Sequence, residues 1–309
     1  MNPTMDHERT ARRRHHRVDT GEVLLDVEVL GPTGPASGAP VLLVSGLGAQ
    51  RIDWPPGLVA ALRAAGHEVV AFDHRDAGAS SGCHERPGDA ADLDRWRDGR
   101  PFRVPYRLQD LADDAIAILD HLGIEVAHVI GRSMGGMVAQ RLAIHAPERV
   151  RSLTSMQSTT GAPDVGQPTP AAMEALAVAT PPEREAVVAA GLARSRITGS
   201  PGLIDDDAVR RRIGAAFDRA HRPEGTTRQL LAILAEEDRT ALLRGVATPT
   251  LVVHGDADTL VPVSGGRATA AAIPGAQLVE VAGLGHDLPD RLLPRVAEAI
   301  VDHLADAEG

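Results

Sequence analysis

The chain has 309 residues and a formal net charge of −10, and 43% of its residues are hydrophobic. This length and composition allow a sizeable core, while the acidic balance argues against a nucleic-acid surface, which needs clustered Lys and Arg. Aromatic residues make up only 2%, so a stacking platform for single-stranded nucleic acid is not expected. The basic run at residues 12–17 is interpreted as a solvated, frayed N-terminal segment.

Cysteine content and hydropathy bear on the compartment. Cys83 is the only cysteine, which excludes an intramolecular disulfide and agrees with a reducing cytoplasm. Residues 1–18 lack the apolar core of a signal peptide. No apolar run reaches the ~18 residues that a membrane helix needs. We therefore expect a cytoplasmic protein that has no membrane partner.

Short apolar runs alternate with amphipathic segments along most of the chain. Strands are predicted at residues 22–30, 41–44, 68–72, 126–130, 150–156, 250–254 and 277–281. Helices are predicted at residues 57–65, 108–122, 134–145, 265–273 and 292–304. This alternation predicts the α/β class, with a mostly parallel, doubly wound sheet covered by helices on both faces.

The strand rhythm stops between residues 157 and 239, where only helices are predicted, at 171–178, 183–194, 208–220 and 227–235. We interpret residues 157–239 as a helical cap inserted into a core formed by residues 1–156 and 240–309. Because open α/β sheets bind ligands at the carboxyl edge of their strands, the cap should cover that edge. The apolar residues expected to line a substrate pocket there are Met173, Leu176, Val187 and Leu192.

One motif indicates catalysis. Gly131-Arg132-Ser133-Met134-Gly135 has the pattern G-x-S-x-G, with a predicted strand before it and a predicted helix directly after it. This context is typical of a nucleophile elbow, a sharp turn that lifts the serine oxygen above the sheet edge. Glycine flanks suit a strained turn that neighbouring elements approach closely. Ser133 is therefore predicted to be a nucleophile.

A serine hydroxyl needs a base, and the base needs an acid that orients it. His286 follows the last predicted strand, on the sheet edge that carries Ser133, and is the expected general base. The acid should follow the preceding strand, where Asp258 is preferred and Asp256 is the alternative. The backbone N–H groups of Met134 and Leu47 are the expected donors to a developing oxyanion.

Together these segments resemble the α/β-hydrolase superfamily along nearly the whole chain. Ser45-Gly46-Leu47-Gly48 occupies the place of the family's His-Gly oxyanion loop, with Ser instead of His. Residues 73–80 look like its Asp-x-Arg-Gly-x-Gly-x-Ser turn, with Asp76 replacing a glycine. In that family the acid is the aspartate three residues after the glycine of the strand end, which selects Asp258. The resemblance implies an α/β-hydrolase fold with a helical cap.

A narrower resemblance concerns the substrate. Trp54-Pro55, Asp73-His74-Arg75-Asp76 and Gly285-His286-Asp287-Leu288-Pro289 are similar to aclacinomycin methylesterase-like hydrolases, which implies hydrolysis of a carboxylic ester. The predicted function is thus a serine esterase that forms an acyl-enzyme and uses no metal and no organic cofactor. Two alternatives stay open: the same triad acting on thioester, lactone, peracid or carbon–carbon bonds, and a non-catalytic ligand receptor. The expected partner is a small-molecule ester, and self-association into a homo-oligomer is left open.

Overall fold

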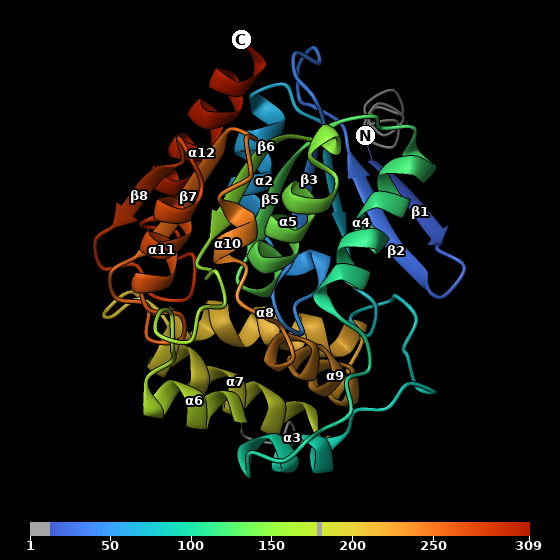
Figure 1. Ribbon diagram of the computed structural model, residues 1–309, viewed down its shortest axis with the longest axis vertical. Coiled ribbons are helices and arrows are strands. Elements are labelled where there is room, and N and C mark those ends of the chain that lie inside the picture. The colour runs from blue at the N-terminus through green and yellow to red at the C-terminus, as the bar shows by residue number, and fades with distance from the viewer. Residues whose placement is uncertain (1–12, 178–180) are drawn as a thin grey trace, which may run out of the picture.

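The computed structural model describes residues 13–177 and 181–309, in which an eight-stranded sheet forms the centre (Figure 1). The strands are β1 (Arg13–Asp19), β2 (Leu24–Leu30), β3 (Val41–Val44), β4 (Val69–Phe72), β5 (Ala127–Arg132), β6 (Val150–Met156), β7 (Thr250–Gly255) and β8 (Gln277–Val281). Their order in the sheet is β1-β2-β4-β3-β5-β6-β7-β8. Only the pairs β1–β2 and β2–β4 are antiparallel, which confirms the predicted mostly parallel sheet.

Helices cover both faces of this sheet. They are α2 (Pro56–Ala64), α3 (Ala90–Arg97), α4 (Leu108–Leu122), α5 (Met134–His145), α6 (Pro170–Ala177), α7 (Arg184–Thr198), α8 (Asp206–Arg219), α9 (Pro223–Leu234), α10 (Thr240–Leu243), α11 (Ser264–Ala272) and α12 (Leu293–Glu308), with short 3-10 turns η1 (Arg51–Asp53) and η2 (Pro147–Arg149). No helix in the described ranges combines the length and apolar character that crossing a bilayer requires.

The core has two parts, one on each face of the sheet. Helices α4 and α5 bury apolar residues such as Leu111 and Val138 against one face. Helices α2 and α12 bury Leu58 and Ile300 against the other face. A fully buried side chain of this size stabilises the fold by about 1.5–3 kcal/mol relative to an exposed one. The wholly buried strand β3 between these layers explains why residues 41–44 read as a continuous apolar run.

The interpretation of residues 12–17 as frayed is wrong for the part that the structure describes; Arg12 lies outside it. Residues Arg13–Asp19 form strand β1, which pairs with β2 along its full length. Most of its side chains are exposed, and Arg14 pairs with Glu68 at 2.9 Å. Basic side chains suit an edge strand because they discourage further strands from pairing with it.

Helix α3 is a second element that periodicity did not predict. Asp89 accepts a hydrogen bond from the amide of Asp92, which caps the start of α3. Although α3 belongs to the chain segment assigned to the core, it lies beside the cap helices and packs against α9 (Figure 1).

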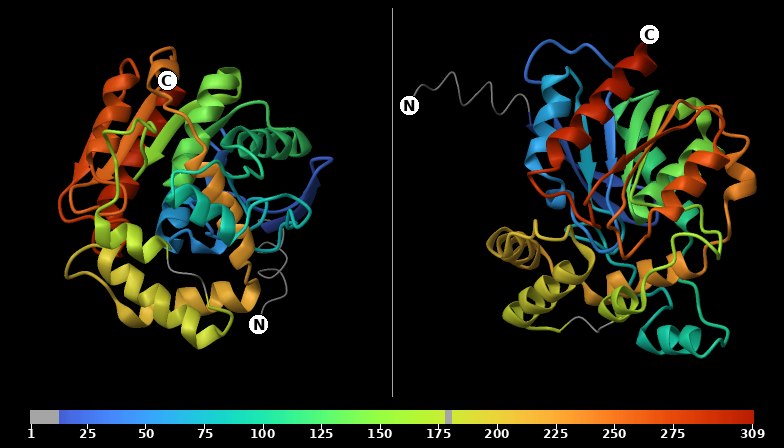
Figure 2. Two further views of the ribbon diagram at one scale, coloured as in Figure 1. Left: turned by 60° about the horizontal axis from the view of Figure 1, so that its bottom comes forward. Right: turned by 90° about the vertical axis from the view of Figure 1, so that its left-hand side faces the viewer.

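Helices α6 to α9 all lie at one end of the sheet, as two further views show (Figure 2). Their predicted counterparts agree within a few residues, and Val178, at the end of the first predicted segment, is outside the described residues. Helix α9 begins at Pro223, earlier than predicted, because proline suits the first helical position.

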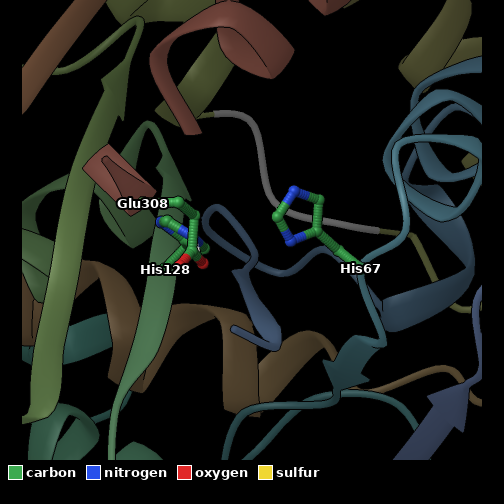
Figure 3. Close-up of side chains that lie close together, drawn as sticks. All are labelled: His67, His128 and Glu308. Carbon is green, nitrogen blue, oxygen red and sulfur yellow. Dashed lines mark hydrogen bonds and ion pairs between the residues drawn. The ribbon is translucent and has the colours of Figure 1, made fainter. Parts of the chain in front are cut away.

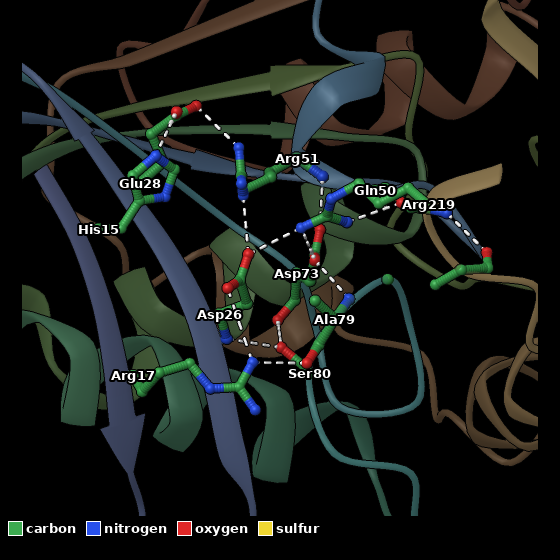
Figure 4. Close-up of polar contacts among 12 residues, drawn as sticks. His15, Arg17, Asp26, Glu28, Gln50, Arg51, Asp73, Ala79, Ser80 and Arg219 are labelled. Atoms are coloured by element: carbon green, nitrogen blue, oxygen red, sulfur yellow. Dashed lines mark hydrogen bonds and ion pairs between the residues drawn. The ribbon is translucent and has the colours of Figure 1, made fainter. Parts of the chain in front are cut away.

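Partly and fully buried charges hold helix α8 against the sheet (Figure 4). Arg219, at the end of α8, donates to Asp26 Oδ2 at 2.7 Å and to Gln50 Oε1 at 2.7 Å, and pairs with Asp73 Oδ2 at 2.6 Å. Arg51 of η1 also pairs with Asp26 at 2.9 Å. Together these contacts connect strand β2, the loop after β4 and helix α8. Such charges are tolerated away from water because each has several partners.

Candidate active site

Ser133 lies at the sharp turn between β5 and α5. Its backbone has φ 57° and ψ −121°, a conformation that a non-glycine residue rarely adopts. A Cβ added to Gly135 would lie 2.0 Å from the carbonyl oxygen of Val44, and one added to Gly131 would lie 2.1 Å from that of Gly135. Only glycine fits at both positions, which explains the spacing of the motif and the close approach of β3.

Three predicted side chains form one hydrogen-bonded series. Oγ of Ser133 is 3.0 Å from Nε2 of His286, and Nδ1 of His286 is 2.7 Å from Oδ2 of Asp258. The three residues follow three different strands, β5, β7 and β8, that end at the same edge of the parallel sheet. A hydroxyl, an imidazole and a carboxylate in this order can activate the hydroxyl as a nucleophile.

The two aspartates after β7 differ in their contacts. Asp258 is buried, and its Oδ1 accepts hydrogen bonds from the amides of Leu260 and Val261, both at 2.9 Å, while Oδ2 faces His286. Asp256 is exposed and accepts the amide of Gly283 at 2.7 Å. The geometry therefore brings Asp258, and not Asp256, to the imidazole.

The expected oxyanion donors lie beside the serine. Met134 is the first residue of α5, so its N–H has no acceptor within the helix. A Cβ on Gly46 would lie 3.3 Å from Cβ of Ser133, which places the loop of Leu47 against the nucleophile. Leu47 and Met134 also line the same cavity as Ser133. Backbone donors at this place can face the oxygen of a bound carbonyl group.

Arg132 holds the loop that carries His286, and the sequence did not predict this contact. Its Nε donates to Oε1 of Gln157 and its Nη2 donates to the carbonyl oxygen of His286, both at 2.6 Å. Gln157 in turn donates from Nε2 to the carbonyl oxygens of Gly285 and Asp287, at 2.5 and 2.9 Å. Gln157 has a positive φ of 48°. No sequence pattern indicates this backbone conformation, so the sequence carried no signal for these contacts.

A cavity of about 1930 Å³ opens over Ser133 and His286 between the sheet edge and the cap. Its volume exceeds the ~300–1,000 Å³ that is usual for a small-molecule pocket. Met173 and Leu176 of α6 line it as expected, but Val187 and Leu192 do not. The lining residues of α7 are Arg194, Ser195 and Thr198 near its C-terminal end, whereas Leu192 is buried. Helix α3, through Leu93 and Trp96, forms a further wall.

Cys83 lies outside this cavity lining and is buried. Burial raises the pKa of its thiol to about 11, and the nearby Asp76 carboxylate adds to this rise. The thiolate, which is the nucleophilic form, is therefore scarce at neutral pH.

A second group of polar side chains, His67, His128 and Glu308, brings its ligand-type atoms within 4.8 Å of one another (Figure 3). His128 Nε2 lies 3.0 Å from Glu308 Oε1, and His67 Nδ1 lies 2.9 Å from the carbonyl oxygen of Ala39. His128 lies near the start of β5, while Ser133 follows the end of that strand, so this group sits at the opposite edge of the sheet. Its contacts join the last turn of α12 to the sheet.

Known proteins resemble this chain over most of its length. A family model described as alpha/beta hydrolase fold matches residues 39–290. Rhodomycin D methylesterase DnrP of Streptomyces peucetius is 32% identical over 307 residues, covering 93% of this chain and 96% of the relative. Rhodomycin D methylesterase DauP of Streptomyces sp. (strain C5) is 31% identical, covering 87% and 92%.

The fold has close counterparts among solved structures. A hydrolase from Pseudomonas aeruginosa PA01 superposes with a TM-score of 0.70 at 25% identity, covering 96% of this chain and 98% of the other. The family model matches more than half of the chain, and the first relative exceeds 30% identity over nearly its whole length. The chain therefore belongs to the alpha/beta hydrolase family.

Proposed function

We propose that this protein is a serine hydrolase that cleaves a carboxylic ester through an acyl-enzyme intermediate. The observation that carries the proposal is the series Ser133 Oγ, His286 and Asp258 Oδ2, joined at 3.0 and 2.7 Å beside a large cavity. The similarity to two methylesterases along nearly the whole chain supports an ester as the substrate.

The first half of the reaction forms the acyl-enzyme. His286 Nε2 accepts the proton of Ser133 as Oγ attacks the ester carbonyl carbon. Asp258 holds the imidazole through Nδ1 and stabilises the imidazolium that forms. The protonated His286 then gives its proton to the alkoxy oxygen, so that the alcohol leaves and the acyl group stays on Ser133.

The second half repeats these steps with water. His286 removes a proton from a water molecule, which attacks the acyl carbon, and then protonates Ser133 Oγ as the carboxylic acid is released. In both halves the carbonyl oxygen carries negative charge, and the N–H groups of Leu47 and Met134 would stabilise it. Arg132 positions His286 without entering the chemistry, because it contacts the backbone oxygen of His286 and not its ring.

The cavity supports a bulky substrate. Its volume of about 1930 Å³ leaves room for an acyl group much larger than a short aliphatic chain. We propose that residues 157–239 act as the cap and that Met173 and Leu176 contribute to the choice of substrate, since both line the cavity.

The decisive experiment compares the wild type with Ser133→Ala on a panel of a methyl ester, a thioester and a lactone. We expect turnover of the ester by the wild type, with loss of nearly all of it in the variant and no change in the thermal midpoint. A fluorophosphonate probe should label Ser133 and no other serine. Faster turnover of the thioester or lactone would reassign the substrate class, and no turnover of any panel member would favour a ligand receptor.

A further inference from the structure

Arg194 carries a charge for which the described part of the protein offers no partner. It lies in α7, one helical turn before the last residue of that helix, and lines the cavity that also contains Ser133 and His286. Its Nε is buried and has no hydrogen-bond partner, and no ion pair of its guanidinium is present among the described residues. Burial alone lowers the pKa of Arg194, and no neighbouring carboxylate raises it again.

Arg194 is partly buried, and two fully buried arginines of the described chain show the usual pairing. Arg75 donates to both carboxylate oxygens of Asp114, at 2.7 and 2.8 Å, and Arg228 donates to both oxygens of Asp76, at 2.9 and 2.7 Å. A guanidinium stays protonated at neutral pH, so Arg194 remains a cation although its Nε is withdrawn from water. A charge that is partly withdrawn from water and has no partner in the protein is stabilised when a ligand pairs with it.

Helix α7, which carries Arg194, contacts the loop of His286 at its C-terminal end. The carbonyl oxygen of Thr198, the last residue of α7, accepts the amide of His286 at 2.6 Å. The hydroxyl of Thr198 donates to the carbonyl oxygen of Arg194 at 3.1 Å, one helical turn earlier. One turn advances the helix by about 5.4 Å, so Arg194 stands on the cap side of the cavity, a short way along α7 from the loop of the base.

Arg132, the residue before Ser133, also lines this cavity, but its guanidinium is already engaged. Its Nε and Nη2 donate to Gln157 and to the carbonyl oxygen of His286. Arg194 therefore differs from Arg132 in being free to bind a group that enters the cavity.

We propose that Arg194 binds a carboxylate on the substrate, separate from the ester group that is cleaved. The guanidinium offers a planar pair of N–H donors that matches the two oxygens of a carboxylate. This inference rests on the proposed function and narrows it: the substrate is a half-ester, with one esterified and one free acid group. The second acid group anchors the molecule on the cap side while the ester reaches Ser133.

The test uses pairs of esters that differ in charge. Rates are measured for the monomethyl esters of succinic, glutaric and terephthalic acids, which keep a free carboxylate, and for the neutral dimethyl esters. The wild type should have a higher kcat/KM for the monoester than for the diester of at least one acid. In Arg194→Gln we expect this ratio to fall by about 10- to 100-fold, the loss typical of a hydrogen bond to a charged group. Arg194→Lys, which keeps the charge, should retain part of the preference.

Arg196→Gln is the matched control. Arg196 lies two residues further along α7, is exposed and pairs with Asp206, and it does not line the cavity. In Arg196→Gln the ratio of kcat/KM for the monoester to kcat/KM for the diester should equal that of the wild type. The thermal midpoint of Arg194→Gln should not fall, because the substitution removes no hydrogen bond or ion pair of the guanidinium.

Three outcomes separate this inference from the proposed function. If the ratio is the same in the wild type and Arg194→Gln, or if the wild type prefers the neutral esters, the role of Arg194 is wrong, while Ser133-dependent turnover would still support the esterase. If no ester is cleaved, the proposed function fails. In that case calorimetric titration of monomethyl terephthalate into Ser133→Ala and into Ser133→Ala/Arg194→Gln still tests whether Arg194 binds a carboxylate. Equal affinities of the two variants would show that it does not.

Discussion

Nη2 of Arg132 donates a 2.6 Å hydrogen bond to the carbonyl oxygen of His286, so the residue before Ser133 holds the loop that carries His286. Replacing Arg132 by Met keeps the apolar stem but removes this bond and the one to Gln157. We expect kcat for an ester to fall by about 10- to 100-fold, because hydrogen bonds from a charged donor are worth about 1.5–3 kcal/mol. The rate of labelling by a fluorophosphonate should fall in parallel.

The control for this prediction is Arg151→Met, at an exposed position on the neighbouring strand β6. It should leave kcat and the labelling rate unchanged. A value of kcat for Arg132→Met within two-fold of the wild type would show that the loop of His286 needs no such brace.

The surroundings of Ser133 could be predicted from the sequence, whereas the contacts of Arg132 could not. The strand, the glycine-flanked turn and the helix around Ser133 are consecutive in the chain, so local pattern predicts them. The contacts of Arg132 join residues 25 and 154 positions apart, and their existence depends on how the sheet brings distant strand ends together. A single sequence holds no direct signal of such contacts.

Elements whose stability depends on neighbours were also harder to predict. Six of the seven residues of strand β1 are polar, and only Val18 is buried; the segment is a strand because β2 offers its hydrogen bonds. In the cap, apolar residues could be recognised, but not the side on which each lies. Met173 therefore lines the cavity whereas Leu192 is buried in the cap, although both are apolar helix residues.

The two aspartates after β7 give a second prediction. Asp258→Asn should lower kcat by up to about 10⁴-fold, because an amide cannot stabilise the imidazolium and favours the wrong tautomer of His286. Asp256→Asn should change kcat only a few-fold, since Asp256 contacts the amide of Gly283 and not the imidazole. Steady-state kinetics of both variants on one ester are sufficient, and a larger loss in Asp256→Asn would reverse the assignment.

Asp76 takes the place of a glycine in the family's turn pattern that residues 73–80 resemble, and its contacts predict a cost in stability when it is removed. It has φ 69° and accepts hydrogen bonds from Arg228, from the hydroxyl of Tyr106 at 2.9 Å and from the amide of Cys83 at 2.7 Å. Asp76→Ala leaves the buried Arg228 unpaired and should lower the free energy of unfolding by about 3–5 kcal/mol.

Denaturant titration measures this loss, and a second variant identifies its cause. Asp76→Ala/Arg228→Met removes both charges, so it should recover a large part of the lost free energy of unfolding. No recovery would mean that the loss comes from the backbone of the turn, where alanine tolerates a positive φ poorly.

The last prediction concerns pH and His74. This side chain is fully buried, with Nε2 3.1 Å from the carbonyl oxygen of Ser45 and no partner for Nδ1. Burial lowers its pKa from 6.5 to about 4. Between these two pH values the unfolded chain binds a proton at His74 that the folded chain does not bind, so the free energy of unfolding falls as the pH falls.

A shift of this size corresponds to a loss of about 3 kcal/mol on acidification from about pH 7 to pH 4. His74→Gln cannot take up the proton, so its free energy of unfolding should fall less over the same range. His84→Gln is the control, because His84 is an exposed loop residue of the same type. Urea titrations across this range compare the three proteins, and parallel curves for the wild type and His74→Gln would show that His74 does not cause the acid sensitivity.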